Sequence, residues 1–113
     1  MLRKALILTL LAVPAVAVAD DDWVALRAEA LRAALEGRVL QYENARQDFR
    51  ASGKTLYTSN GRDSWGNWRI EGDRYCSQWP PSDLWACYGL ERAGATLRFV
   101  GQGNDITEAT YAD

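Results

Sequence analysis

The chain has 113 residues, with 13 lysines and arginines, 15 aspartates and glutamates, two cysteines and no histidine. This length allows a single domain and excludes a Rossmann-sized catalytic domain or a barrel enzyme. A net charge of −2 gives no reason to expect a nucleic-acid partner, because phosphate binding requires a basic surface. The lack of histidine removes most zinc sites and most acid–base schemes near neutral pH, so we expect neither a metal nor a cofactor.

Residues 1–19 have the pattern of a secretory signal peptide. Arg3-Lys4 gives a basic start, Ala5 to Val13 is a continuous apolar run, and Ala17-Val18-Ala19 supplies small residues at a cleavage site. The apolar run is too short for a membrane anchor, which takes about 20 residues. We therefore expect one domain, residues 20–113, in the periplasm or outside the cell, with no membrane span. Loss of Arg3-Lys4 changes the net charge from −2 to −4.

The first element predicted in this domain is a helix over about residues 22–36. Acidic residues precede it, where the helix dipole favours negative charge, and Gly37 is placed to end it. The apolar residues at helical spacing form one stripe. They are Val24, Ala28, Leu31 and Leu35.

After Gly37 the periodicity changes from that of a helix to that of short strands. The predicted strands are 38–43, 47–51, 55–59, 67–71, 74–79, 84–91, 96–100 and 106–111. Tight-turn signals such as Asn60-Gly61 and Gly72-Asp73 separate them, which is typical of an antiparallel meander. The predicted fold is α+β and mostly β, with the N-terminal helix packed on a curved sheet of six to eight strands (about 38–111). The sequence does not decide whether this sheet closes into a small barrel.

The two cysteines are predicted to form a disulfide. If the chain turns near Pro81-Ser82, a hairpin places Cys76 opposite Cys87, close enough to bridge in a non-hydrogen-bonded pair. An exported chain meets an oxidising compartment, which favours the bond. A redox pair would want C-x-x-C spacing, and a metal would need further ligands that this chain lacks.

Tryptophans and arginines concentrate around this hairpin. For Trp68 we expect a place in the core, with Tyr75 and Tyr88 packed side by side. Trp79 and Trp85 flank the proline-rich turn, where core packing and an exposed groove are about equally expected. As a binding surface we select four residues. They are Trp79, Trp85, Arg69 and Arg74, since tryptophan beside arginine is typical of interface hot spots. The alternative for the arginines is a solvated, weakly paired surface.

Catalysis has little support in the sequence. No serine has a histidine to act as its base, and Lys54 in a turn would be solvated and charged. A carboxylate pair is the remaining option, Asp63 with Asp73 or Glu71, as in glycoside hydrolysis. Aspartate beside glycine in a tight turn is also explained by backbone geometry alone.

One segment and a later dipeptide match the sequence pattern of a known family. They are Gly66-Asn67-Trp68-Arg69-Ile70-Glu71-Gly72-Asp73-Arg74-Tyr75-Cys76 and Cys87-Tyr88. Together they resemble the pattern G-x-W-x-[IV]-x-x-D-x-[YF]-C … C-[YF] of a family of small exported proteobacterial proteins without an established function. The resemblance covers about residues 35–100 and implies no catalytic residues. A dihydrodipicolinate reductase label used in this family has no support here, because the three-glycine dinucleotide fingerprint is missing.

A second resemblance is architectural only. Periplasmic lysozyme inhibitors are similar in size, export signal, disulfide and β-structure, but their inhibitory motif has no match in this chain. We therefore expect a non-catalytic periplasmic or secreted domain that binds a protein, a peptide or an envelope glycan. The alternatives are a small hydrolase with paired carboxylates and an enzyme inhibitor of the lysozyme-inhibitor type.

Overall fold

The computed structural model describes residues 22–113, so the predicted signal peptide lies outside the described residues. This part of the chain forms one helix, α1 (Ala28–Leu35), and nine strands. The strands are β1 (Val24–Ala25), β2 (Arg38–Gln41), β3 (Arg46–Phe49), β4 (Lys54–Ser59), β5 (Arg62–Glu71), β6 (Arg74–Gln78), β7 (Trp85–Ala93), β8 (Thr96–Val100) and β9 (Ile106–Tyr111).

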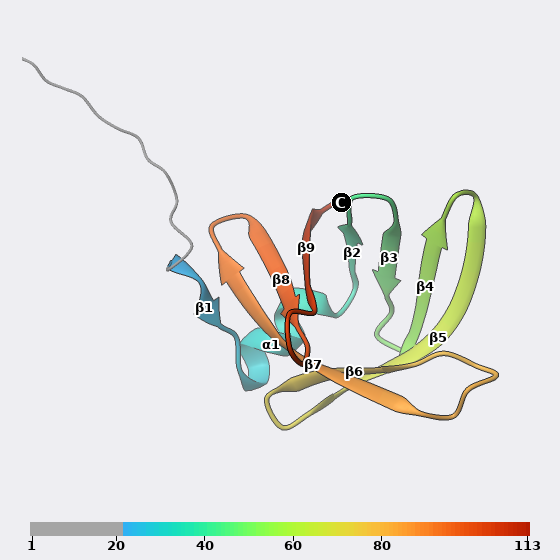
Figure 1. The fold of residues 1–113 in the computed structure, drawn as a ribbon, viewed down its shortest axis with the longest axis horizontal. Coiled ribbons are helices and arrows are strands. Elements are labelled where there is room, and N and C mark those ends of the chain that lie inside the picture. Colours follow the sequence, from blue (N-terminus) through green and yellow to red (C-terminus); the bar gives the residue numbers. More distant parts are fainter. Residues whose placement is uncertain (1–21) are drawn as a thin grey trace, which may run out of the picture.

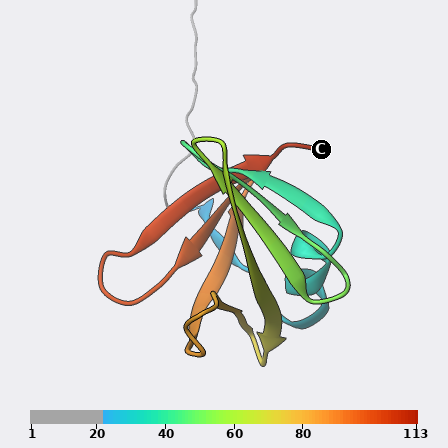
Figure 2. The ribbon, with the colours of Figure 1, turned by 90° about the vertical axis from the view of Figure 1, so that its right-hand side faces the viewer.

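The strands β2 to β9 form a closed, antiparallel barrel in simple meander order (Figures 1 and 2). Each strand pairs with the next along the chain, and β9 returns to pair with β2, which closes the ring. The ninth strand, β1, lies outside the ring and pairs with the end of β7. Closure removes the free edges that an open sheet would expose. The prediction of a mostly β fold with an N-terminal helix is confirmed, and the sheet is closed.

The predicted strands agree closely with the observed ones, with one substantial difference in β5. This strand begins at Arg62 rather than at residue 67, because all six residues of β4 pair with it from Lys54↔Asn67 to Ser59↔Arg62. The Asn60-Gly61 turn therefore connects the two strands directly. Both residues have positive φ, +54° and +74°, as a two-residue hairpin turn requires.

The helix is shorter than the predicted range of 22–36. Its first predicted turns are wrong, because Val24–Ala25 pair with β7 as strand β1 instead. The side chain of Val24 is 63% exposed, whereas Leu31, Ala34 and Leu35 are buried. The helix ends as predicted, with Gly37 at φ +75° just after it.

The order of elements distinguishes the two ends of the barrel. In a meander, the loops β2–β3, β4–β5, β6–β7 and β8–β9 all lie at one end, and α1, which leads into β2, lies at the other. Figure 1 shows the β4–β5 and β6–β7 hairpins reaching away from α1. At the helix end, Asp73 in the β5–β6 turn accepts a hydrogen bond from the backbone N–H of Ala28 at 3.2 Å. We call these the helix end and the open end.

The core fills the helix end. Three residues of α1 pack against side chains that point inward from the strands. The buried cluster contains Leu31, Ala34, Leu35, Leu40, Phe49, Trp68, Tyr75, Leu90, Leu97, Phe99 and Ala109. Trp68 is 4% exposed and packs edge-on against Phe49 at 5.7 Å between ring centroids, so its predicted place in the core is confirmed. Helix and aromatic rings together close this end of the barrel.

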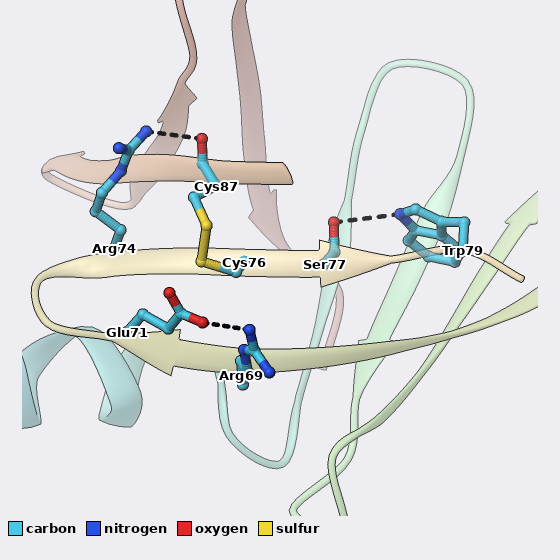
Figure 3. Close-up of a disulfide and its surroundings, with 7 residues drawn as sticks. All are labelled: Arg69, Glu71, Arg74, Cys76, Ser77, Trp79 and Cys87. Atoms are coloured by element: carbon cyan, nitrogen blue, oxygen red, sulfur yellow. Dashed lines mark hydrogen bonds and ion pairs between the residues drawn. A yellow bond between two sulfur atoms is a disulfide. The ribbon is translucent and has the colours of Figure 1, made fainter. Parts of the chain in front are cut away.

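The predicted disulfide joins Cys76 on β6 to Cys87 on β7, with their Cα atoms 4.0 Å apart (Figure 3). The two residues are direct partners in the β6–β7 register, so the chain turns at Pro81-Ser82 as predicted. Within residues 22–113, no helix has the length and apolar character needed to cross a membrane.

Candidate functional site

A cavity of about 710 Å³ occupies the open end of the barrel. Half of the residues around it are aromatic, and most of the others are polar. They are Tyr42, Gln47, Tyr57, Asp63, Ser64, Trp65, Tyr75, Ser77, Trp79, Pro80, Tyr88, Phe99, Asp105 and Thr107. This volume is within the usual range of small-molecule sites, roughly 300–1,000 Å³. The barrel is therefore packed at the helix end and hollow at the open end.

The alternation of side chains along each strand places most of these aromatic residues inside, but not Trp65, which alternates with the inward-facing Gly66 on β5 and is 48% exposed. Tyr57 lies two residues after the buried Thr55 on β4, and Tyr75 lies opposite Tyr88 in the β6–β7 register. Their rings form a nearly continuous wall. The centroid of Tyr57 is 6.1 Å from that of Tyr42 and 6.0 Å from that of Trp79. Tyr75 and Tyr88 are 6.2 Å apart, so their predicted packing is confirmed.

A buried hydrogen-bond network lies where the cavity meets the core. The Thr55 hydroxyl donates its proton to the backbone carbonyl of Asp48 at 2.9 Å, so its oxygen is free only to accept. The Gln47 amide N–H₂ donates to Thr55 Oγ1 at 2.9 Å and to the Tyr75 hydroxyl at 3.2 Å. The Gln47 amide oxygen accepts from the Tyr42 hydroxyl at 2.6 Å. Each donor and acceptor of Gln47 is thus assigned.

Burial perturbs the two tyrosines of this network. Desolvation raises the pKa of the Tyr42 hydroxyl, and the neighbouring Tyr75 and Tyr57 add to the effect. Desolvation likewise raises the pKa of Tyr75, against opposing hydrogen bonds from Ser77 and Gln47. Both hydroxyls therefore remain neutral and able to donate hydrogen bonds at physiological pH.

Trp79 reaches the cavity wall because the opposite strand has a glycine. A Cβ atom placed on Gly66 would lie 2.5 Å from the Trp79 ring and 2.7 Å from the Gln78 carbonyl oxygen. The absence of a side chain at Gly66 lets the ring lie against the backbone of β5. The Trp79 indole N–H donates to the Ser77 hydroxyl at 3.2 Å (Figure 3).

The four residues predicted as one binding surface lie on two faces of the barrel. Trp79 lines the cavity, but Trp85 shares the outer face with Cys87, two residues further along β7. The Arg69 guanidinium lies over the Trp85 ring at 3.8 Å from its centroid, and it also forms an ion pair with Glu71. Arg74, at the helix end of β6, donates to the Cys87 carbonyl at 2.9 Å (Figure 3).

The outer face around the disulfide does not form a metal site. Ligand atoms of Glu71, Cys76 and Cys87 lie within 4.8 Å of one another. The two sulfur atoms are bonded to each other, however, so neither is available as a thiolate. The arginines and the disulfide instead cover this part of the outer wall of the barrel.

The three carboxylates considered for hydrolysis are not brought together. Asp63 lies at the open end, where it accepts a hydrogen bond from the Thr58 hydroxyl at 2.9 Å. Asp73 lies at the helix end, where it contacts Arg27 and the start of α1, and Glu71 is paired with Arg69 nearby. The length of β5 separates Asp63 from Glu71 and from Asp73, so the pairs proposed from the sequence have no common substrate position.

Comparisons with known proteins add no assignment to this geometry. No protein-family model matches the chain, and neither the curated proteins nor the solved structures include a match. The function therefore has to be argued from the cavity itself.

Several cavity residues were missed in the sequence analysis, namely Tyr42, Gln47, Tyr57 and Asp105. The sequence feature that could have identified them is the alternation of side chains along each strand. Tyr42 lies two residues after the buried Leu40, and Gln47 lies two residues before the buried Phe49. Once a strand has one known inward residue, every second residue faces the same way. Applied toward the open end of the strands, this rule identifies Tyr42, Gln47 and Tyr57 as inward-facing, but it does not find Asp63 or Trp65, which alternate with the inward-facing Ser64 and Gly66.

Proposed function

We propose that this chain is an exported, non-catalytic binding domain that takes part of a glycan or peptide ligand into the open end of its barrel. The observation that carries the proposal is the cavity of about 710 Å³, lined by seven aromatic residues among fourteen. Aromatic faces bind apolar rings and sugar faces over a large area at a low cost in side-chain entropy, while a few polar groups fix the orientation.

The cavity also differs from a defect in core packing. A core void is apolar and small, because protein interiors pack at the density of organic crystals. Here the helix end is filled by aromatic and aliphatic side chains, whereas the open end keeps hydroxyl, amide and carboxyl groups around an empty space. Rigid walls support the space, since strands on all sides are hydrogen-bonded and β6 is cross-linked to β7.

Two further observations support an exported location. The pattern in residues 1–19 is typical of chains that a secretion pathway exports. The disulfide Cys76–Cys87 belongs in an oxidising compartment such as the periplasm. An envelope location would give the domain access to peptidoglycan and to the peptides attached to it.

A dye-binding experiment tests the proposal. N-phenyl-1-naphthylamine, a neutral aromatic dye that fluoresces in apolar surroundings, is titrated into the oxidised protein, and peptidoglycan fragments are then added as competitors. The variant Thr107→Trp adds an indole on the cavity side of β9, because Thr107 lies opposite the buried Phe99. Glu108→Trp is the matched control, since the next residue faces outward.

We expect the dye to bind the unmodified protein and Glu108→Trp equally, and to bind Thr107→Trp at least about tenfold more weakly. Competition by the fragments would support a glycan or peptide ligand from the envelope. Equal dye binding by both tryptophan variants would show that the dye lies elsewhere, and would overturn the proposal.

A further inference from the structure

The charged residues that line the cavity are all acidic. Among the described residues around the cavity there is no lysine or arginine, but there are two aspartates, Asp63 and Asp105. The Asp63 carboxylate accepts a bond from Thr58, and these two residues are direct partners in the β4–β5 register. The Asp105 carboxylate has no hydrogen-bond or ion-pair partner within residues 22–113. The cavity thus offers an uncompensated negative charge.

Asp105 is exposed at the rim of the cavity, beside an aromatic ring. A Cβ atom built on Gly101 would lie 2.7 Å from Asp105 Oδ2 and 2.9 Å from Cε2 of Tyr88. The carboxylate and the ring edge therefore both lie against the bare backbone of Gly101. This is the second place in the cavity where a glycine makes room for a wall residue, after Gly66 and Trp79. An alanine at residue 101 would displace the carboxylate, the ring or both.

Aromatic faces and a carboxylate without a competing cation favour positively charged ligands. The ring quadrupole attracts an ammonium group placed over the face, most strongly for tryptophan and when water is excluded. Tyr42, Tyr57 and Trp79 form one part of the wall and Tyr88 another, with Asp105 next to Tyr88. Quaternary ammonium compounds are the ligands for which such aromatic enclosures are best known.

The deep part of the cavity offers a different group, a hydrogen-bond donor. Tyr75 is 5% exposed, and its hydroxyl oxygen accepts from Gln47. The Ser77 hydroxyl is a second hydrogen-bonding neighbour of this hydroxyl, and it can accept the Tyr75 proton. Gln47 is already committed through both its amide N–H bonds and its carbonyl oxygen. A ligand oxygen that takes the place of Ser77 would accept the Tyr75 proton.

We propose that the cavity binds an organic ammonium ligand that also carries a hydroxyl group, the ammonium lying toward Asp105 and the hydroxyl toward Tyr75. This inference rests on the proposed binding function and specifies its ligand class. Two sources have this chemistry, an amino sugar of a glycan and a choline-type headgroup. A carboxylate ligand is disfavoured, because the lining has no cation to pair with it.

Matched probes on the unmodified protein test the charge requirement. Choline is compared with 3,3-dimethyl-1-butanol, in which carbon replaces the ammonium nitrogen, and glucosamine is compared with glucose. Each is titrated calorimetrically and by displacement of N-phenyl-1-naphthylamine. We expect choline or glucosamine to bind about tenfold tighter than its neutral counterpart. The tighter of the two charged probes indicates the source of the ligand.

Three variants test where the ammonium and the hydroxyl group of the ligand lie in the cavity. Asp105→Asn should lose most of the preference for the charged probe, whereas Glu108→Gln on the outer face of β9 should keep it. Tyr75→Phe should weaken choline several-fold but leave tetramethylammonium, which has no hydroxyl, unchanged. Equal affinity of the charged and neutral probes would overturn this inference while the binding function stands. Failure of the dye itself to enter the cavity would instead overturn the binding function.

Discussion

Replacing Gly66 by alanine tests whether the cavity wall depends on the missing side chain. The added Cβ would lie 2.5 Å from the Trp79 ring and 2.7 Å from the Gln78 carbonyl oxygen, and real Cβ atoms do not approach so closely. The ring can move, but the carbonyl belongs to the paired backbone of β6, where Asn67 lies opposite Gln78. The substitution therefore forces a shift of the β5–β6 ladder as well as of Trp79.

The structure indicates how much unfolding free energy Gly66→Ala should cost, and it provides a matched control variant. Overpacking of this kind costs about 1–3 kcal/mol of unfolding free energy. Gly89 on β7 has no positive φ, and a Cβ there would meet only the Val100 carbonyl at 3.9 Å, an ordinary contact. Gly89→Ala should stabilise the protein by about 0.5–1 kcal/mol, because alanine loses less backbone entropy in a strand. We expect the two variants to differ by about 2 kcal/mol or more.

Urea unfolding followed by circular dichroism measures this difference. For a domain of this size, each kcal/mol also moves the thermal midpoint by roughly 4–8 °C. Gly66→Ala should cost less in a Trp79→Ala background than in the unmodified protein, because the ring is then absent and only the Gln78 carbonyl opposes the added Cβ. If Gly66→Ala is as stable as Gly89→Ala, the close packing of Trp79 on β5 is not a constraint, and the argument for a preformed aromatic wall fails.

Three other changes have expected outcomes. Removing the disulfide with Cys76→Ala and Cys87→Ala should lower the unfolding free energy in urea by about 3 kcal/mol, from the loop-entropy relation applied to a separation of 11 residues. Asp73→Ala removes the acceptor of the Ala28 backbone N–H and should cost about 1 kcal/mol in the same assay, whereas Asp73→Asn should cost less. Burial raises the pKa of Tyr75 above 10.0, so the unfolded chain loses this proton first and stability falls as pH rises past about 10. Tyr75→Phe should reduce that alkaline loss, measured as the slope of unfolding free energy against pH.

Most of the fold could be predicted from local signals. The Gly72-Asp73 turn sets the β5–β6 register, and the cysteine pair sets the β6–β7 register, since both depend on residues close in the chain. Closure of the barrel could not be predicted in this way. It depends on the pairing of β2 with β9, including Leu40↔Tyr111, and no local signal links segments so far apart. The cavity is a consequence of closure, so it was not foreseen either.

The split of the predicted binding surface has a more specific cause. Trp79 and Trp85 were grouped because both flank the same proline-rich turn, but closeness to a turn does not determine which face a side chain takes. Trp79 lies an odd number of residues after Cys76, so it faces opposite to the disulfide, into the barrel. Trp85 lies an even number of residues before Cys87, so it shares the outer face. Because a disulfide between adjacent strands lies on one face of the sheet, the cysteines alone could have separated the two tryptophans. The sequence alone thus places Trp79 and Trp85 on opposite faces of the sheet, and the structure, in which the face of Trp79 lines the cavity, makes Trp79 rather than Trp85 the tryptophan to follow in binding experiments.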